Sequence, residues 1–245
     1  MRQYLPTNDF VYKNIQTDSE KKVVFLSGMG LDIRKQREGF FRRNALLQEV
    51  SYLALDYTAY TMKNRDKSDF NIGQSLPQTI DTLMQDDKKL FLCGLCYGGL
   101  MALKIAAQIP ERIGGIVALS PPFETETFPW LEKTNNFLKK REEMLKTRKT
   151  DHQMLQQMIL FREIMSIAIG TQGREKIEPT FQGPIHIFHG EKDRLIPVEN
   201  SIHVQRALNN PNCALHISPM TGHALNNDFE MKALIRALND CLIRG

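Results

Sequence analysis

The stretch FLCGLCYGGL, residues 91–100, decides the fold of this chain. It places Cys93 and Cys96 between an apolar run typical of a buried strand and an apolar run typical of a helix. Glycines flank the second cysteine in the pattern Gly94-x-Cys96-x-Gly98. The stretch therefore has three interpretations: a redox-active cysteine pair, a pair of metal ligands, or a single nucleophilic thiol.

The spacing of the glycines favours the single nucleophile. Gly-x-Cys-x-Gly between a strand and a helix matches the nucleophile elbow, with cysteine in place of the usual serine. The backbone of such a turn is strained, and side chains two positions before and after the nucleophile would collide with neighbouring backbone. The turn also places Cys96 at a helix N-terminus, where the positive end of the helix dipole favours a thiolate.

The redox and metal interpretations have less support in the sequence. A thioredoxin-like domain also places a C-x-x-C pair between strand and helix, but such domains are much shorter than 245 residues. In this chain Cys93 would end the strand, with its side chain in the packing of the sheet. A zinc site needs a second pair of ligands, and no finger-like spacing is found among Cys213, Cys241, His186 and His189.

Short apolar runs alternate with helical patterns along the chain. We expect strands at 23–27, 52–57, 90–94, 114–120, 185–190 and 214–219, and helices near 36–49, 74–85, 98–109, 198–208 and 228–243. Most of the strand candidates are continuous apolar runs, as in strands buried on both faces of a parallel sheet. The alternation predicts an α/β fold with a doubly wound, mostly parallel sheet.

One segment interrupts this alternation. No strand pattern appears between residues 124 and 184, where the sequence has helical periodicity instead. An insertion at this point would lie above the carboxyl edge of the sheet, where α/β proteins bind ligands. We therefore interpret 124–180 as a helical cap or lid, and 1–123 together with 181–245 as the core domain.

Composition restricts the class of protein and its compartment. A hydrophobic content of 42% and a net charge of +4 suit a globular protein and give no reason to expect nucleic-acid binding. The N-terminus lacks the apolar run of a signal peptide, and no window of 18 uncharged apolar residues occurs, so we expect no transmembrane span. The four cysteines are few and irregularly spaced, which favours a reducing compartment, and we expect the cytoplasm.

A nucleophilic thiol needs a base, and the base needs an acid to orient it. Two later stretches supply candidates: HGEKDRLIP contains Asp193, and TGHALNN contains His223. Each stretch follows the carboxyl end of an expected strand, where catalytic sites of α/β sheets are built. The chain order of nucleophile, acid and histidine is that of the α/β-hydrolases.

Taken together, these motifs resemble the α/β-hydrolase superfamily from about residue 23 to the C-terminus. The motifs that carry the resemblance are SGMG, GLCYGG, HGEKDRLIP and GHALNN. The resemblance implies Cys96 as nucleophile, His223 as base and Asp193 as orienting acid. It also implies an oxyanion hole formed by the backbone N–H groups of Met29 and Tyr97, with no cofactor and no metal.

The chain departs from the superfamily pattern at two positions. Ser27 stands where members usually have histidine before the first glycine of the oxyanion loop, and Cys96 stands where they usually have serine. Dienelactone hydrolases use cysteine in an elbow similar to GLCYGG, but they have no large lid. The insertion and the spacing of the later motifs look more like lidded acyl hydrolases, including acyl-protein thioesterases.

We therefore expect a hydrolase that cleaves a carboxylic ester or thioester through a covalent acyl-enzyme. Because thiolate attacks such carbonyls well, a cysteine favours activated esters, thioesters or lactones over amides. The substrate would be a small acyl ester or thioester, an acylated protein or a CoA ester. The alternatives are a thiol–disulfide protein using Cys93 and Cys96, a catalytically silent binding module, an acyltransferase, and a hydrolase in which Cys96 replaces a serine.

Overall fold

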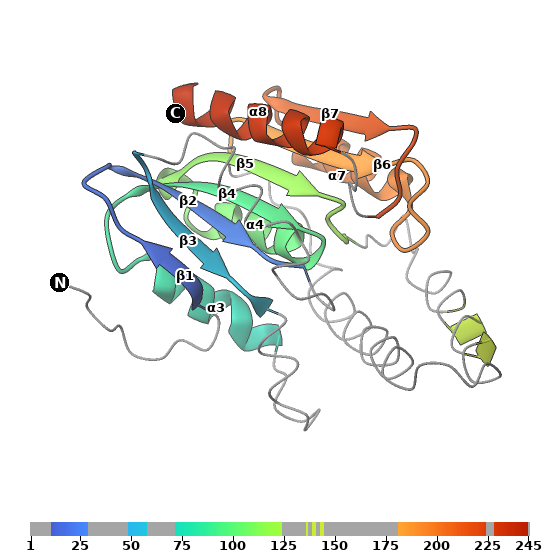
Figure 1. The fold of residues 1–245 in the computed structure, drawn as a ribbon, viewed down its shortest axis with the longest axis horizontal. Coiled ribbons are helices and arrows are strands. Elements are labelled where there is room, and N and C mark those ends of the chain that lie inside the picture. The colour runs from blue at the N-terminus through green and yellow to red at the C-terminus, as the bar shows by residue number, and fades with distance from the viewer. Residues whose placement is uncertain are drawn as a thin grey trace.

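The chain is built around one mixed sheet, shown in Figure 1. The computed structural model describes residues 11–28, 49–57, 72–123, 181–223 and 228–244, and single helical positions at 136, 139, 140, 143 and 144. The strands are β1 (Val11–Ile15), β2 (Lys21–Leu26), β3 (Ser51–Leu55), β4 (Lys89–Leu95), β5 (Ile113–Leu119), β6 (Ile185–Gly190) and β7 (Cys213–Ser218). The helices are α3 (Ile72–Leu83), α4 (Tyr97–Gln108), η2 (Pro110–Arg112), α7 (Val198–Leu208) and α8 (Asp228–Arg244).

The strand order in the sheet is β1-β3-β2-β4-β5-β6-β7. β1 pairs antiparallel with β3, and the other five pairings are parallel. The predicted doubly wound, mostly parallel sheet is confirmed, and the six expected strands lie within two residues of their predicted bounds. β1 was not predicted. Its residues alternate between half-buried and exposed, so it lacks the apolar run that marks the other strands.

Helices cover both faces of the sheet, and each face has its own hydrophobic core. Side chains of α3, α4 and α7 pack against one face together with Val24 and Leu26 of β2. Side chains of α8 pack against the other face together with Val23 and Phe25 of the same strand. Because alternate residues of β2 enter opposite cores, the strand is apolar throughout, as the sequence pattern indicated.

Two sequence-based expectations lie outside the described residues. They are the helix near 36–49 and almost all of the segment 124–180 that we interpret as a lid. Within the part of the chain that is described, no helix has both the length and the apolar character needed to span a lipid bilayer.

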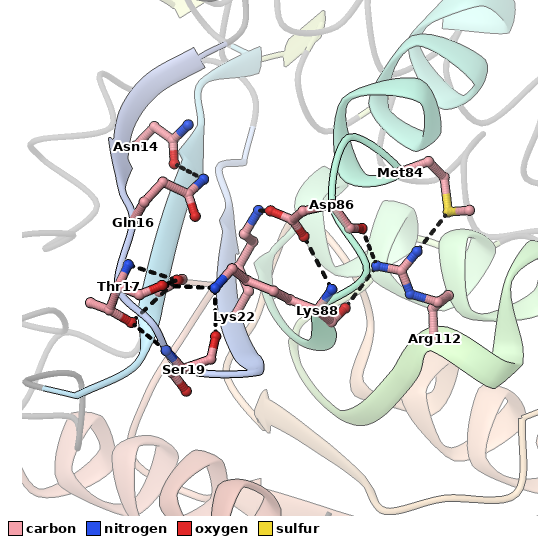
Figure 2. Close-up of polar contacts among 10 residues, drawn as sticks. Asn14, Gln16, Thr17, Ser19, Lys22, Met84, Asp86, Lys88 and Arg112 are labelled. Carbon is pink, nitrogen blue, oxygen red and sulfur yellow. Dashed lines mark hydrogen bonds and ion pairs between the residues drawn. The ribbon is translucent and has the colours of Figure 1, made fainter. Parts of the chain in front are cut away.

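The amino edge of the sheet is closed by a network of polar contacts, shown in Figure 2. Lys22 at the start of β2 forms an ion pair with Asp86. The Lys88 Nζ atom donates to the Ser19 carbonyl at 2.5 Å, and an Arg112 guanidinium nitrogen donates to the carbonyls of Asp86 and Lys88 at 2.5 and 2.8 Å. These bonds connect the turn before β2, the loop before β4 and the start of β5.

Candidate active site

The central strand β4 and helix α4 meet in a sharp turn at Cys96. The backbone of this residue has φ 50° and ψ −117°, a region that L-residues with a side chain rarely adopt. Its N–H donates to the Leu119 carbonyl at the end of β5, with a nitrogen–oxygen distance of 2.7 Å. The strained turn is therefore fixed from the neighbouring strand, and the Cys96 residue keeps 7% exposure.

The glycines on both sides of Cys96 are required by close backbone approaches. A Cβ atom on Gly98 would lie 2.1 Å from the Leu26 carbonyl oxygen. A Cβ atom on Gly94 would lie 2.1 Å from the Gly98 carbonyl oxygen. Backbone cannot move away from such an overlap without displacing β2 or α4, so the steric reason for the glycine pattern holds at both positions.

The residue after the cysteine, Tyr97, is held by an aromatic contact. Its ring packs edge-on against Tyr57, with 5.4 Å between ring centroids. The Tyr57 hydroxyl in turn shares a hydrogen bond of 3.2 Å with the Thr79 hydroxyl on α3. Tyr97 is the first residue of α4, directly after Cys96, whereas Met29 lies outside the described residues.

The acid and the histidine of the sequence pattern are in direct contact. Asp193 follows β6 and His223 follows β7, and His223 Nδ1 donates to Asp193 Oδ2 at 2.8 Å. The second carboxylate oxygen, Oδ1, accepts from the backbone N–H groups of Leu195 and Ile196 at 2.8 and 3.0 Å. The side chain of Asp193 is fully buried, while 22% of the His223 side chain is exposed.

Close packing of two loops explains how side chains 30 positions apart meet. The Lys192 N–H donates to the Thr221 carbonyl at 2.9 Å. A Cβ atom on Gly190, at the end of β6, would lie 2.3 Å from the Gly222 carbonyl oxygen. The loop after β6 and the loop after β7 therefore run against each other backbone to backbone, which only glycine at Gly190 permits.

The surroundings lower the pKa of Asp193 and raise the pKa of His223, so each group is favoured in its charged form. Burial alone would raise the pKa of Asp193, but hydrogen bonds from His189 and His223, the positive charge of His223 and the Ile196 amide hold that pKa well below its usual range. Burial alone would lower the pKa of His223, but the charge of Cys96, the contact with Asp193 and a hydrogen bond to the Cys96 side chain raise it well above 6.5. The structure thus brings Cys96, His223 and Asp193 together.

Three further residues support this arrangement and were not expected from the sequence. Ser120 ends β5 with φ 43°, and its hydroxyl donates to the His223 carbonyl at 3.5 Å. His189 and Ser201 form a buried contact beside Asp193. The available signals were the Ser-Pro-Pro break after an apolar strand, and a histidine four positions before the acid.

Ser27, which stands where superfamily members usually have histidine, forms hydrogen bonds that link two strands. Its hydroxyl accepts from the Tyr57 N–H at 2.9 Å and lies 3.3 Å from Asp56 Oδ1, to which it donates. Ser27 therefore ties the carboxyl end of β2 to that of β3. In the described part of the chain, no group of three or more His, Cys, Asp or Glu side chains is placed to hold a metal ion.

A mostly parallel sheet of this strand order, with a strained strand-to-helix turn after its central strand, is the architecture of the α/β-hydrolases. Within that class, the chain belongs to the family described as serine aminopeptidase, S33. The sequence model of that family matches residues 74–230, which is more than half of the chain. The family name refers to a serine nucleophile, whereas the elbow of this chain carries Cys96.

Solved structures show the same fold at low sequence identity. The α/β-hydrolase domain-containing protein 10 from mouse matches with a TM-score of 0.66 and 14% identity, covering 98% of both chains. An esterase from Exiguobacterium antarcticum matches with a TM-score of 0.62 and 17% identity, covering 94% of both chains. A monoacylglycerol lipase from Paleococcus ferrophilus matches with a TM-score of 0.60 and 16% identity, covering 94% of this chain and 99% of its own. No curated protein sequence matches the chain significantly.

Proposed function

We propose that this chain hydrolyses carboxylic esters or thioesters through a covalent acyl-enzyme on Cys96. The observation that carries the proposal is the hydrogen bond of His223 to the buried Asp193 carboxylate, with both residues at the edge of the sheet where Cys96 follows β4 in a strained turn. The fold adds support, because solved structures that share it include an esterase and a monoacylglycerol lipase. No group other than these side chains and backbone amides is needed for the reaction.

In the acylation step, the Cys96 sulfur attacks the carbonyl carbon of the substrate. The carbonyl electron pair moves to the oxygen, and the resulting oxyanion accepts hydrogen bonds from the backbone N–H groups of Tyr97 and Met29. When the tetrahedral intermediate collapses, His223 gives its proton to the departing alkoxide or thiolate. The product of this step is an acyl-cysteine and a neutral imidazole.

In the second step, a water molecule releases the acid. Neutral His223 takes a proton from the water while the water oxygen attacks the acyl carbon. The Cys96 sulfur then leaves as a thiolate beside a protonated His223, so the starting pair is restored. Throughout the cycle Asp193 keeps the imidazole in the tautomer with a proton on Nδ1 and stabilises its positive charge.

The cysteine nucleophile favours esters and thioesters over amides. The interactions that raise the pKa of His223 favour its protonated form, which can supply a proton to the leaving group. A thiolate is a better leaving group than an amine, so a tetrahedral intermediate formed on an amide returns to reactants more often than one formed on an ester. We therefore place the substrate among acyl esters, thioesters and lactones, including acylated proteins and CoA esters.

The thiol–disulfide alternative loses support from the surroundings of Cys93. Its side chain is fully buried in the core beneath α8, where Cys241 is its neighbour. Burial raises the pKa of Cys93 far above its ordinary value, which disfavours the thiolate needed for disulfide exchange. The few, irregularly spaced cysteines carry our proposal of a reducing compartment such as the cytoplasm.

The segment 124–180 connects β5 with β6, so we propose that it covers the carboxyl edge as a lid. Its apolar residues would then line the acyl pocket. In that arrangement, the length of the acyl chain that is hydrolysed fastest would indicate the depth of the pocket between the lid and Cys96.

The test is hydrolysis of two matched series, acyl esters and acyl thioesters from acetyl to palmitoyl. The variants are wild type, Cys96→Ala and Cys96→Ser, with Cys93→Ala as a control for the loss of a thiol three positions away. We expect turnover by wild type and Cys93→Ala, and none by Cys96→Ala. Turnover by Cys96→Ser but not by wild type would identify a hydrolase silenced by cysteine, and transfer to added alcohols would identify an acyltransferase.

A further inference from the structure

A second histidine lies beside the proposed catalytic acid, next to the same carboxylate oxygen that His223 contacts. His189, next to last in β6, has no exposed surface and lies four residues before Asp193. Its Nε2 atom lies 3.2 Å from Asp193 Oδ2 and 2.9 Å from the Ile196 carbonyl oxygen. Its Nδ1 atom lies 2.6 Å from the Ser201 hydroxyl. One imidazole thus bridges strand β6, the acid loop and helix α7.

The partners of the ring determine its tautomer. A backbone carbonyl can only accept a hydrogen bond, so the proton next to Ile196 must be on Nε2 of His189. The same nitrogen lies 3.2 Å from Asp193 Oδ2, within ion-pair distance. The other ring nitrogen, Nδ1, shares a hydrogen bond with the Ser201 hydroxyl, so both nitrogens of the ring have a partner.

This arrangement fixes the carboxylate at both of its oxygens. The backbone amides of Leu195 and Ile196 hold Oδ1, but they leave the carboxylate free to swing about that point. Oδ2 is shared between His189 and His223. With His189 in place, Oδ2 is confined to a position from which it can accept from His223 Nδ1.

We propose that His189 is a positioning residue, which holds Asp193 Oδ2 in line with His223 Nδ1. Its contacts are with Asp193, Ile196 and Ser201, so it acts on the reaction through the acid. The inference rests on the proposed function of the site. The hydrogen bond from His189 is also the largest of the interactions that keep the pKa of Asp193 low against the effect of burial.

The test compares two amides that differ in reach by one methylene. In His189→Gln the amide nitrogen stands near the place of Nε2 and can still donate to Asp193. In His189→Asn it stands near the place of Nδ1 and cannot reach the acid. A residue that only fills a polar site in the core would accept both amides alike, whereas a positioning residue distinguishes them.

We expect His189→Gln to keep kcat within about threefold of wild type. We expect His189→Asn to lose about 10- to 100-fold in kcat with unchanged KM, the usual cost of losing an outer partner of a catalytic group. A second measurement needs no substrate: NMR titration of the His223 ring. Cys96 and Asp193 are the charged groups that face this ring, and the pKa should fall toward 6.5 in His189→Asn but not in His189→Gln.

His186→Asn is the matched control, because His186 lies on the same strand but pairs with His216 at the surface. It should change neither kcat nor the His223 titration. If His189→Asn does not fold, Ser201→Ala takes its place, because it removes the donor that holds Nδ1. Equal kcat and equal His223 titration in the two amide variants, or a wild-type result for Ser201→Ala in that case, would overturn the proposal. A wild type that turns over no ester but shows the raised His223 pKa would sink the proposed function alone.

Discussion

The two edges of the sheet both carry buried and half-buried charges, yet the charges are used differently. At the amino edge, Lys88 donates to the carbonyls of Thr17 and Ser19, and Arg112 donates to two carbonyls of the loop before β4, as Figure 2 shows. At the carboxyl edge, His223 and Asp193 are directed toward each other and toward a strained turn. Side chains bind mainly backbone at the first edge and other side chains at the second.

The difference separates structural polar groups from reactive ones. A lysine or arginine side chain that donates to backbone carbonyls stabilises a turn. Its N–H donors are then engaged in the structure and do not take part in a reaction. A histidine between a thiol and a carboxylate has shifted protonation and can move a proton. Both clusters follow from the α/β sheet, in which strand starts and strand ends collect at opposite edges, and the proposed site lies at the strand ends.

The largest expected effect comes from exchanging an aspartate at each edge for asparagine. Asp193→Asn should lower kcat by about 10⁴-fold, because the amide presents its donor to His223 and selects the wrong tautomer. Asp86→Asn should leave kcat unchanged but cost up to about 3 kcal/mol in unfolding free energy, because the buried Lys22 loses its charged partner. Steady-state kinetics and urea unfolding of both variants measure this contrast. An equal loss of kcat in the two variants would contradict the different roles of the two edges.

The next effect is steric and compares neighbouring glycines of the elbow. Gly98→Ala places a Cβ 2.1 Å from a backbone carbonyl oxygen and should cost about 3 kcal/mol or more in unfolding free energy. Gly99→Ala places its Cβ 3.2 Å or more from its neighbours and should cost about 1 kcal/mol. Chemical denaturation of both variants measures the two losses of unfolding free energy. Similar costs would show that the elbow relaxes, which would contradict a rigid carboxyl edge.

The third effect concerns pH and follows from the raised pKa of His223. Its favourable charge interactions are fully present below the ordinary value of 6.5 and are lost as pH rises through the folded value. Alkyl-ester turnover, which needs the proton of His223, should therefore fall about tenfold per pH unit above that value. Thioester turnover should fall less, because a thiolate is a weaker base than an alkoxide and depends less on proton transfer from His223 as it leaves. Parallel alkaline limbs for the two substrates would contradict proton donation by His223.

The smallest effect belongs to the amino edge. Lys88→Met removes two hydrogen bonds to carbonyls, which ties the loop before β4 less firmly to the turn before β2. We expect a loss of about 1 to 2 kcal/mol in unfolding free energy and no change in kcat or in the His223 titration. Thermal unfolding and the kinetic assay give the two values. A selective loss of kcat would mean that the edges are coupled through the sheet.

The sequence predicts the parts of the molecule that depend on local pattern. Five of the six predicted strands are visible because burial on both faces makes each of them an apolar run, whereas β7 is a partly exposed edge strand that packs against one core only. The elbow is visible because only glycine fits the close approaches around Cys96. The order of Cys96, Asp193 and His223 along the chain indicates a site because each follows a strand at the same edge.

What the sequence does not reveal depends on contacts between distant segments. The role of His189 beside Asp193 requires the position of Ser201 on the next helix, which no local pattern specifies. The positive φ of Ser120 follows from the bond of its N–H to Phe188 on the neighbouring strand. β1 is missed because an edge strand with one exposed face lacks a strong signal.

The most direct test of the central claim is detection of the acyl-enzyme itself. Wild type, Cys93→Ala and Cys96→Ala are mixed with an activated thioester, quenched in acid and measured as intact protein and as peptides by mass spectrometry. We predict one acyl group on the peptide that contains Cys96 in wild type and in Cys93→Ala, and none on the corresponding peptide of Cys96→Ala. Acylation that persists in Cys96→Ala, or that maps to another residue in wild type, would contradict it.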